Sequence, residues 1–274
     1  MPTTVVVVGA SRGIGYQFVQ TLAAEGNTVI ATARNVADLE GKVKADKIPN
    51  THVVQADLIS ADSLKAAAKA TSSLVNGQID HILINGAFLS STGGMNPTDF
   101  ADKPELFLEQ LRRSDEANIA GPLFTINAFL PLLRAGKEKR VTYISSSVAD
   151  GPETIETRVS NSVPYSTSKA GGNIVITKFA AELQDEGFTF LSIAPGAVAT
   201  ETMMAALNDA SKYTEEEKAK MQLMIGRMMQ KYPEWKGPIP PEESVKRILN
   251  VVKNSKVEQS GQFLSYWGNT TQWL

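Results

Sequence analysis

Short runs of apolar residues alternate along this chain with longer segments that are apolar on one side only. Parallel strands that are buried on both faces carry continuous runs of Val, Ile and Leu, and the helices that join them are amphipathic. The pattern predicts strands at Val5–Val8, Thr28–Ala33, His52–Gln55, His81–Ile84, Val141–Ser145, Phe188–Ala194 and Gln262–Ser265. The expected fold class is therefore α/β, a doubly wound parallel β-sheet of about seven strands with helices on both faces.

Helical periodicity locates the segments that connect these strands. Helices are expected at Gly15–Ala24, Ser63–Leu74, Pro104–Leu133, Ser166–Glu186 and Pro241–Val252. No internal repeat or low-complexity linker divides the 274 residues, so we expect a single domain over residues 1–274. The segment of about 201–240 fits no strand or helix unit, and we expect it to be an irregular, substrate-binding insertion.

That insertion is rich in methionine, with Met203, Met204, Met221, Met224, Met228 and Met229. Methionines at helical spacing are usually core residues, and we favour that interpretation. If they instead form a lid, the substrate is expected to be bulky and apolar.

The charge and composition of the chain exclude several classes of function. The formal net charge is −2, which offers no basic field for nucleic acid or for an anionic membrane. There is no cysteine, so disulfides and thiolate catalysis are excluded, and the two histidines, His52 and His81, are expected to be packing residues in strands rather than metal ligands. We find neither a secretory leader nor an apolar run long enough for a membrane span, so we expect a cytoplasmic protein that acts on a small molecule.

A glycine-rich turn follows the first predicted strand and opens the first helix. Such a turn brings backbone N–H groups and a helix N-terminus against a pyrophosphate, as in Rossmann-type nucleotide-binding domains. An ordinary strand-to-helix reversal is the alternative. The residues that we expect at the cofactor are Gly9, Ser11, Arg12, Gly13, Ile14 and Gly15.

The residues after the second predicted strand indicate which cofactor binds. Folds that prefer NAD place a carboxylate about 20 residues beyond the glycine turn, where it binds the ribose hydroxyls. Here that neighbourhood reads Thr32-Ala33-Arg34-Asn35, without a carboxylate. Arg34, together with Arg12, offers planar donors that suit a 2′-phosphate. The sequence therefore predicts NADP(H), and two solvated surface arginines are the alternative.

Tyr165 and Lys169 stand four residues apart at the start of a predicted helix, so their side chains lie on one face. The pKa of a free tyrosine is about 10. An ammonium about 5 Å away favours the phenolate by about 3 kcal/mol, or about two pKa units, at an effective dielectric constant of 20. We therefore expect Tyr165 to act as an acid or base. Such a pair is common on ordinary helices, so its value depends on its position along the chain.

In that order these motifs resemble the short-chain dehydrogenase/reductase family, over nearly the whole chain from Val5 to Ser265. The resemblance implies that Tyr165 transfers the proton and also contacts the cofactor. It further implies that Lys169 binds the cofactor ribose and that a serine after the fifth strand polarises the substrate oxygen. Aligning Ile144-Ser145-Ser146 with the family's Ile-Ser-Ser implies Ser146 for this role, with Ser147 as the second choice.

The resemblance assigns further residues to the site. Asn118 matches the helix asparagine that in relatives holds a water chain leading from the lysine to solvent; by itself it reads as a helix Asn bonded to its own backbone. Asp57 matches a position beside the adenine, although it could also cap a helix. The full set of further cofactor contacts implied is Asp57, Leu58, Asn85, Gly86, Ala87, Pro195, Gly196, Val198 and Thr200. Gly86 and Phe88 depart from the family's Asn-Asn-Ala-Gly segment.

The implied activity is an NADPH-dependent oxidoreductase of the carbonyl reductase (ketoreductase) type. It would transfer hydride between NADP(H) and a ketone, aldehyde or alcohol of a small apolar metabolite, with reduction as the direction in the cell. Two alternatives stay open: a non-catalytic NADP-binding sensor or scaffold, and a dehydratase or isomerase of a biosynthetic pathway. Relatives usually associate through the helices at 104–133 and 166–186, so a homodimer or homotetramer is expected.

Overall fold

Seven parallel strands form one sheet in the order β3-β2-β1-β4-β5-β6-β7. The computed structural model describes residues 2–208 and 214–274. Its strands are β1 (Thr4–Val8), β2 (Thr28–Ala33), β3 (Thr51–Gln55), β4 (His81–Ile84), β5 (Arg140–Ile144), β6 (Thr189–Ala194) and β7 (Phe263–Ser265). The expected doubly wound parallel sheet is confirmed. The strand order reverses between β1 and β4, and ligands bind at the carboxyl ends of the strands beside such a switch point.

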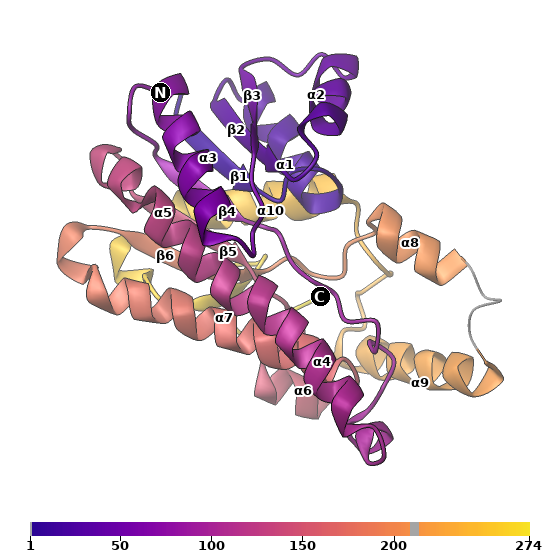
Figure 1. Cartoon of the computed structure of the whole chain (residues 1–274). Coiled ribbons are helices and arrows are strands. Elements are labelled where there is room, and N and C mark those ends of the chain that lie inside the picture. Colours follow the sequence, from indigo (N-terminus) through magenta and orange to yellow (C-terminus); the bar gives the residue numbers. More distant parts are fainter. Residues whose placement is uncertain (1, 209–213) are drawn as a thin grey trace.

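Helices cover both faces of the sheet (Figure 1). They are α1 (Gly13–Ala24), α2 (Val36–Ala45), α3 (Ala61–Leu74), α4 (Pro104–Asp115), α5 (Gly121–Ala135), α6 (Gly151–Thr157), α7 (Val163–Glu182), α8 (Glu201–Asn208), α9 (Glu215–Lys231) and α10 (Pro241–Asn254). Buried residues of α3, α5 and α7 pack on one face of the sheet, whereas those of α1 and α10 pack on the other. Burial of these apolar stripes is the main favourable contribution to the fold.

The sequence pattern missed three features of the chain between the core elements. The expected helix 104–133 contains a π-helical turn, η2 (Glu116–Ala120), between α4 and α5. The segment after β5 forms a short helix, α6, and the supposedly irregular insertion contains the helices α8 and α9. Residues 209–213 of that insertion lie outside the described residues.

The 201–240 insertion leaves the sheet and returns to it at one place. Ala199 N donates to Ile239 O at 2.8 Å, and Ile239 N donates to Ala197 O at 2.8 Å. Val198 and Ile239 thus form an isolated parallel bridge at the base of the insertion. In Figure 1, α8 and α9 project beyond one side of the sheet, and α9 contacts α6.

The two histidines differ in environment. His81 is buried and shares a 2.9 Å hydrogen bond with the Thr142 hydroxyl, and burial lowers its pKa to about 3. It is a packing residue, as expected. His52 is exposed on β3, the edge strand, so the expectation of a packing role is wrong for it.

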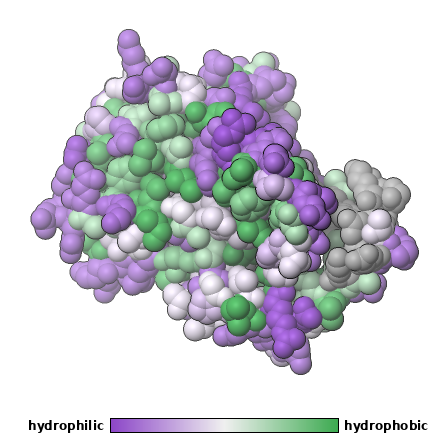
Figure 2. All heavy atoms as spheres, turned by 60° about the horizontal axis from the view of Figure 1, so that its bottom comes forward, coloured by the Kyte–Doolittle hydropathy of each residue, from purple (hydrophilic) through white to green (hydrophobic). Residues whose placement is uncertain are grey.

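Hydrophobic side chains also reach the outer surface. Figure 2 brings the lower side of Figure 1 forward and shows hydrophobic residues among hydrophilic ones over much of this face. Exposed apolar residues occur on neighbouring helices: Leu108 on α4, Leu123 on α5 and Ile174 on α7. Within the described ranges, no helix is both long and apolar enough to cross a membrane.

Candidate active site

The glycine turn between β1 and α1 is packed against the turn that follows β4. Gly9 has φ +81°, and a Cβ there would lie 2.6 Å from the backbone of Gly86. A Cβ on Gly15 would lie 2.1 Å from the carbonyl oxygen of Gly9. Asn85 Nδ2 donates to that same oxygen at 3.2 Å. Both positions therefore require glycine, and the backbone of α1 begins at an open turn that a pyrophosphate can approach.

Three cationic side chains belong to the segments that meet at this turn. Arg12 is the exposed N-cap residue of α1, and Arg34 is exposed directly after β2. Lys42, on α2, donates from Nζ to the Ser11 carbonyl oxygen at 3.0 Å. No local motif marks Lys42 in the sequence, and only the packing of α2 beside the turn brings it there. This donor set fits the 2′-phosphate of NADP(H).

Asp57 and Leu58 follow β3 at the same edge of the sheet. Asp57 does not cap α3, because the Ser60 hydroxyl accepts from Ser63 N in that position. Instead, Asp57 Oδ1 accepts from Ile59 N at 3.3 Å. The Leu58 side chain packs against Gly86 and Gly121, where an added Cβ would meet it at 3.0 Å and 2.6 Å. Ala87 is exposed beside this contact.

The segment after β6 closes the other side of the turn. The Pro195 carbonyl oxygen accepts from the Ser244 hydroxyl at 2.7 Å. Gly196 has φ +79° and lies against the Tyr266 ring. Val198 is buried, and the Thr200 side chain faces Gly13, where a Cβ would lie 3.3 Å from it. The structure thus brings the glycine turn and the 195–200 segment together.

Lys169 is almost completely buried beneath the carboxyl end of β5. Its Nζ donates to the Ile144 carbonyl oxygen at 2.7 Å and lies 5.8 Å from the centroid of the Tyr165 ring. Burial lowers the pKa of Lys169 to about 7. The predicted pair therefore shares one site, at the end of β5 and the first turn of α7.

Burial raises the pKa of Tyr165 to about 12, and the neighbouring Ser146 side chain offsets only part of this rise. The expected decrease in the pKa of Tyr165 is therefore wrong for the chain without a cofactor. A lysine with a pKa near neutrality is a weak source of positive potential, and burial disfavours the phenolate. Tyr165 is held as a protonated phenol, which is the form that donates a proton.

The three serines after β5 have different surroundings. Ser146 is the one that is bonded to Tyr165. The Ser145 hydroxyl is buried and has no hydrogen-bond partner among the described residues. Ser147 begins a short 3-10 turn, η3 (Ser147–Ala149), and lines a neighbouring cavity. This arrangement favours Ser146 over Ser147 for the role beside the tyrosine.

Asn118 lies in the π-helical turn and is completely buried. Its side chain accepts from Phe88 N at 3.0 Å and donates to Phe88 O at 3.1 Å and to the Ser168 hydroxyl at 2.9 Å. These bonds join the turn after β4 to α7. They are made with other elements rather than with the helix's own backbone.

An apolar cavity of about 250 Å³ lies beside the segments that carry Ser146 and Tyr165. Its lining includes Ser147, directly after Ser146, and Ser162, one turn before Tyr165. Most of its wall is apolar or uncharged: Val148, Thr154, Thr157, Val159, Asn161, Met224, Met228 and Leu274. Met224 and Met228 therefore face this space, contrary to the expectation that the methionines are simply core residues.

One charged cluster supports the cavity wall. The buried Glu153 of α6 accepts from Lys231 of α9 and, at 2.8 Å, from the Tyr232 hydroxyl. Glu156 lies 2.6 Å from Lys231. Trp273 N donates to the Tyr232 oxygen at 3.4 Å. Burial lowers the pKa of Lys231, but bonds to both carboxylates outweigh this and raise it overall. We call Glu153, Lys231 and Tyr232 the α6–α9 clamp.

Comparison with known proteins decides the family. The family model for short chain dehydrogenases matches residues 3–211. The chain belongs to this family. Among curated short-chain dehydrogenase relatives, the short-chain dehydrogenase/reductase AacuF of Aspergillus aculeatus is 34% identical over 272 residues, 98% of each chain. The short chain dehydrogenase virK of Hypocrea virens is 32% identical over 275 residues, again 98% of each chain. The chain is therefore an oxidoreductase of the short-chain dehydrogenase type, a family that uses nicotinamide cofactors.

Solved structures share the fold of this short-chain dehydrogenase. The NADPH-bound carbonyl reductase from chicken fatty liver superposes with a TM-score of 0.74 at 24% identity, covering 99% of this chain and 94% of that one. A variant of the actinorhodin polyketide ketoreductase with NADPH superposes with a TM-score of 0.72 at 22% identity, covering 98% of both chains.

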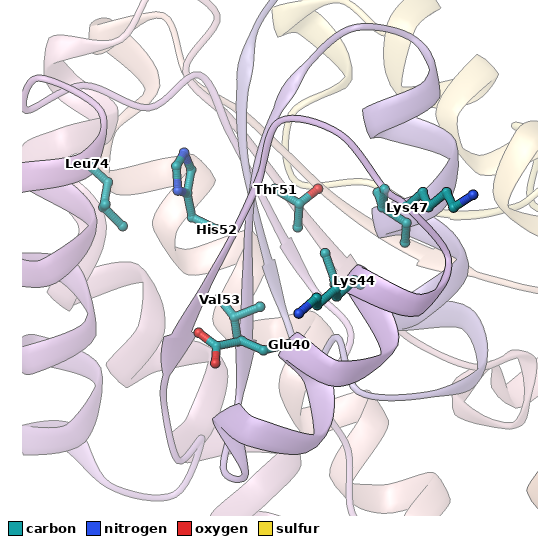
Figure 3. Close-up of a pocket in the computed structure, with 9 residues that line it drawn as sticks. Glu40, Lys44, Lys47, Thr51, His52, Val53 and Leu74 are labelled. Atoms are coloured by element: carbon teal, nitrogen blue, oxygen red, sulfur yellow. The ribbon is translucent and has the colours of Figure 1, made fainter.

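A second hollow of about 350 Å³ lies at the outer edge of the sheet, between α2 and β3 (Figure 3). Glu40, Lys44, Lys47 and His52 line it, with the start of β3 at its floor. It opens widely to the surface, and the strand order places β2, β1 and β4 between β3 and β5, the strand that Ser146 follows. We assign it no part in the dehydrogenase site.

Proposed function

We propose that this short-chain dehydrogenase/reductase is an NADPH-dependent carbonyl reductase. The observation that carries the proposal is the contact of Tyr165 with Ser146 directly above the buried Lys169. A non-catalytic sensor needs Lys169 only to bind the cofactor, and it would not need Ser146 and Tyr165 together beside that lysine.

The preference for NADP(H) is supported by Arg12, Arg34 and Lys42, which surround the glycine turn without a competing carboxylate at Arg34-Asn35. Gly9, Gly13, Gly15, Asn85 and the 195–200 segment would form the cradle of the cofactor. The NADPH-bound carbonyl reductase and ketoreductase named above support this choice through their common fold.

In the proposed reaction a ketone or aldehyde becomes an alcohol. NADPH, when bound, supplies the hydride that reaches the carbonyl carbon. Ser146 donates a hydrogen bond to the carbonyl oxygen, and Tyr165 gives that oxygen its hydroxyl proton, which leaves a phenolate. The cation of Lys169 stabilises this phenolate, and a proton from solvent restores the phenol.

The substrate is proposed to be neutral and largely apolar. The cavity beside Ser147 presents Val148, Val159, Met224 and Met228, and Glu153, the charged side chain among its described lining residues, is neutralised by Lys231. A phosphate or carboxylate group would find no free cation among these residues.

Assembly and location belong to the same proposal. The exposed Leu108, Leu123 and Ile174 on neighbouring helices support a homodimer or homotetramer built through α4, α5 and α7. We propose a cytoplasmic location, where NADPH is available as a reductant. Analytical ultracentrifugation tests the assembly, because a monomer at micromolar concentration would contradict it.

The decisive experiment follows NADPH oxidation at 340 nm against ketones, quinones and aldehydes, with wild-type protein and Tyr165→Phe. We expect turnover of apolar carbonyls by the wild type, and a loss of about 10²–10⁴-fold in the variant, the range for a general acid. NADPH binding, followed by cofactor fluorescence, should weaken far less than turnover. Wild-type turnover by the variant would disprove the role of Tyr165. Binding of NADPH by the wild-type protein without turnover of any carbonyl would favour the sensor.

A further inference from the structure

A buried tyrosine that the mechanism above does not use lies beside the catalytic lysine. Tyr143 is on β5, and none of its side chain is exposed. Lys169 Nζ lies 4.4 Å from the centroid of the Tyr143 ring, compared with 5.8 Å from that of Tyr165. The lysine is therefore closer to the aromatic face of Tyr143 than to its catalytic partner.

The far end of Tyr143 is anchored. Its hydroxyl donates to the backbone carbonyl oxygen of Asn118 at 3.0 Å. A Cβ on Gly172 would lie 2.5 Å from both of these oxygens, so α7 can pass here only with glycine. The side chain of Asn118 is at the same time bonded to Phe88 and Ser168. The ring is thus fixed between β5, the π-helical turn and α7.

Few groups can stabilise a charge on Lys169. From β5 it meets the Ile144 carbonyl oxygen and the Tyr143 ring, and from α7 it meets the Tyr165 ring. Burial alone causes the lowered pKa of Lys169, and no carboxylate of the described chain offsets it. Burial, and then the nearby Tyr165, raise the pKa of Tyr143 well above its usual value, so it remains a neutral donor. A cation over an aromatic face is stabilised most when water is excluded.

We propose that Tyr143 is a positioning residue for the catalytic lysine: its ring face holds the ammonium of Lys169 beneath Tyr165, and its hydroxyl fixes that ring against Asn118. The catalytic consequence rests on the proposed function. The electrostatic contact between the two side chains does not, so it can be tested without a substrate.

The test is a pH titration of Lys169 in protein labelled with ¹³C at lysine Cε. The Lys169 resonance is assigned by its loss in Lys169→Met. Replacing Tyr143 with leucine removes the π face, and we expect the pKa of Lys169 to fall by about half a unit or more. Tyr143→Phe keeps the ring, so the pKa should stay within a few tenths of a unit.

Phe129→Leu is the matched control, since Phe129 is a completely buried aromatic of the same core and has no contact with Lys169 among those described. It should lose stability without moving the Lys169 titration. If Tyr143→Leu does not fold, pentafluorophenylalanine at position 143, compared with Tyr143→Phe, reverses the ring's electrostatics at nearly constant shape. A Lys169 pKa that is the same with and without the π face would overturn the proposal.

Turnover adds a second measurement where a substrate is found, with 9,10-phenanthrenequinone as the probe. If Lys169 must be charged, kcat/KM falls as the pH rises through its pKa, and this limb should move to lower pH in Tyr143→Leu. A purely structural role would lower kcat/KM equally at every pH. Absence of any turnover would count against the proposed function, and the titration would still decide the role of Tyr143.

Discussion

Lys169 Nζ and the Ile144 carbonyl oxygen are joined by a 2.7 Å hydrogen bond in the interior, directly under the end of β5. This bond fixes the height of the lysine relative to Ser146, which lies two residues further along the chain. It also shows how the chain satisfies one donor of a buried amine with backbone rather than with a carboxylate. Because no described carboxylate offsets the effect of burial, the pKa of the Lys169 amine lies near neutrality.

Replacing Lys169 with methionine should stabilise the protein while abolishing turnover. The pKa of Lys169 is about 7 in the folded chain, compared with 10.5 for a lysine side chain in water. Between these values the unfolded chain binds the extra proton, so wild-type stability rises as the pH rises from about 7 to about 10.5. Lys169→Met lacks this dependence and should be more stable near pH 7 by up to a few kcal/mol.

Urea denaturation followed by tryptophan fluorescence at about pH 6.5, 8 and 9.5 measures this difference. The advantage of the variant should shrink toward the highest pH. Tyr165, whose pKa is raised to about 12, alters stability only above about pH 10 and does not interfere. An advantage that is constant with pH would contradict the prediction.

Lys42→Met should weaken NADPH binding and leave NADH binding unchanged. The amine lies on the glycine turn through its bond to the Ser11 carbonyl oxygen. Loss of one exposed cation facing a phosphate should raise the Kd for NADPH about three- to tenfold. Lys44→Met, on the same helix but in the wall of the outer hollow, is the control. Equal losses for both cofactors would instead indicate damage to the turn.

Breaking the α6–α9 clamp should loosen the substrate cavity. Of the two described ion pairs of Lys231, Glu153→Gln leaves the one with the exposed Glu156, and we expect a loss of about 1–3 kcal/mol in unfolding free energy. We also expect the substitution to raise the KM more for small carbonyls than for bulky ones, because α9 carries Met224 and Met228 of the cavity wall. Lys218→Met breaks an exposed ion pair on the same helix and should change neither quantity. A uniform change in kcat with KM unaltered would argue against the clamp.

Asn118→Ala should disconnect the turn after β4 from the catalytic helix. The substitution leaves the backbone N–H and carbonyl oxygen of Phe88 without their partner, and the Ser168 hydroxyl keeps only its bond to the Tyr165 carbonyl oxygen. Buried groups without partners each cost about 1–3 kcal/mol, so we expect a loss of about 2–4 kcal/mol and reduced turnover. The control is Asn173→Ala on α7, whose side-chain oxygen has no described partner, and it should cost clearly less. Equal losses would show that the Asn118 bonds contribute little.

The strands could be predicted from sequence because burial on both faces leaves continuous apolar runs such as Val5–Val8. The helices of the insertion could not be predicted, because α9 is stabilised by contacts with residues that lie far away in the sequence. Its partner Glu153 lies 78 positions from Lys231. The π-helical turn at Asn118 was hidden for a similar reason, since bonds to Phe88 and Ser168 support it rather than a local pattern.

At the candidate site, motif order was enough to bring Ser146, Tyr165 and Lys169 to one place. The direction of the pKa shift of Tyr165 was not predictable. Helical spacing indicates how far Lys169 lies from Tyr165, but it does not indicate the burial that raises the pKa. Tyr143 read as an ordinary strand residue, and its contact with Lys169 exists only because α7 crosses β5 at Gly172. Lys42 stayed unnoticed because α2 carries no motif.

The two backbone bonds that join Ala197 and Ala199 to Ile239 give the 201–240 insertion a closed base. These bonds hold the two ends of the insertion together. The strands and helices that position Tyr165 and Lys169 therefore do not depend on the insertion. Surface segments with fixed ends tolerate changes in length and composition. We therefore propose that the insertion can be exchanged for that of a relative, which would change the choice of substrate and leave Tyr165 and Lys169 in place.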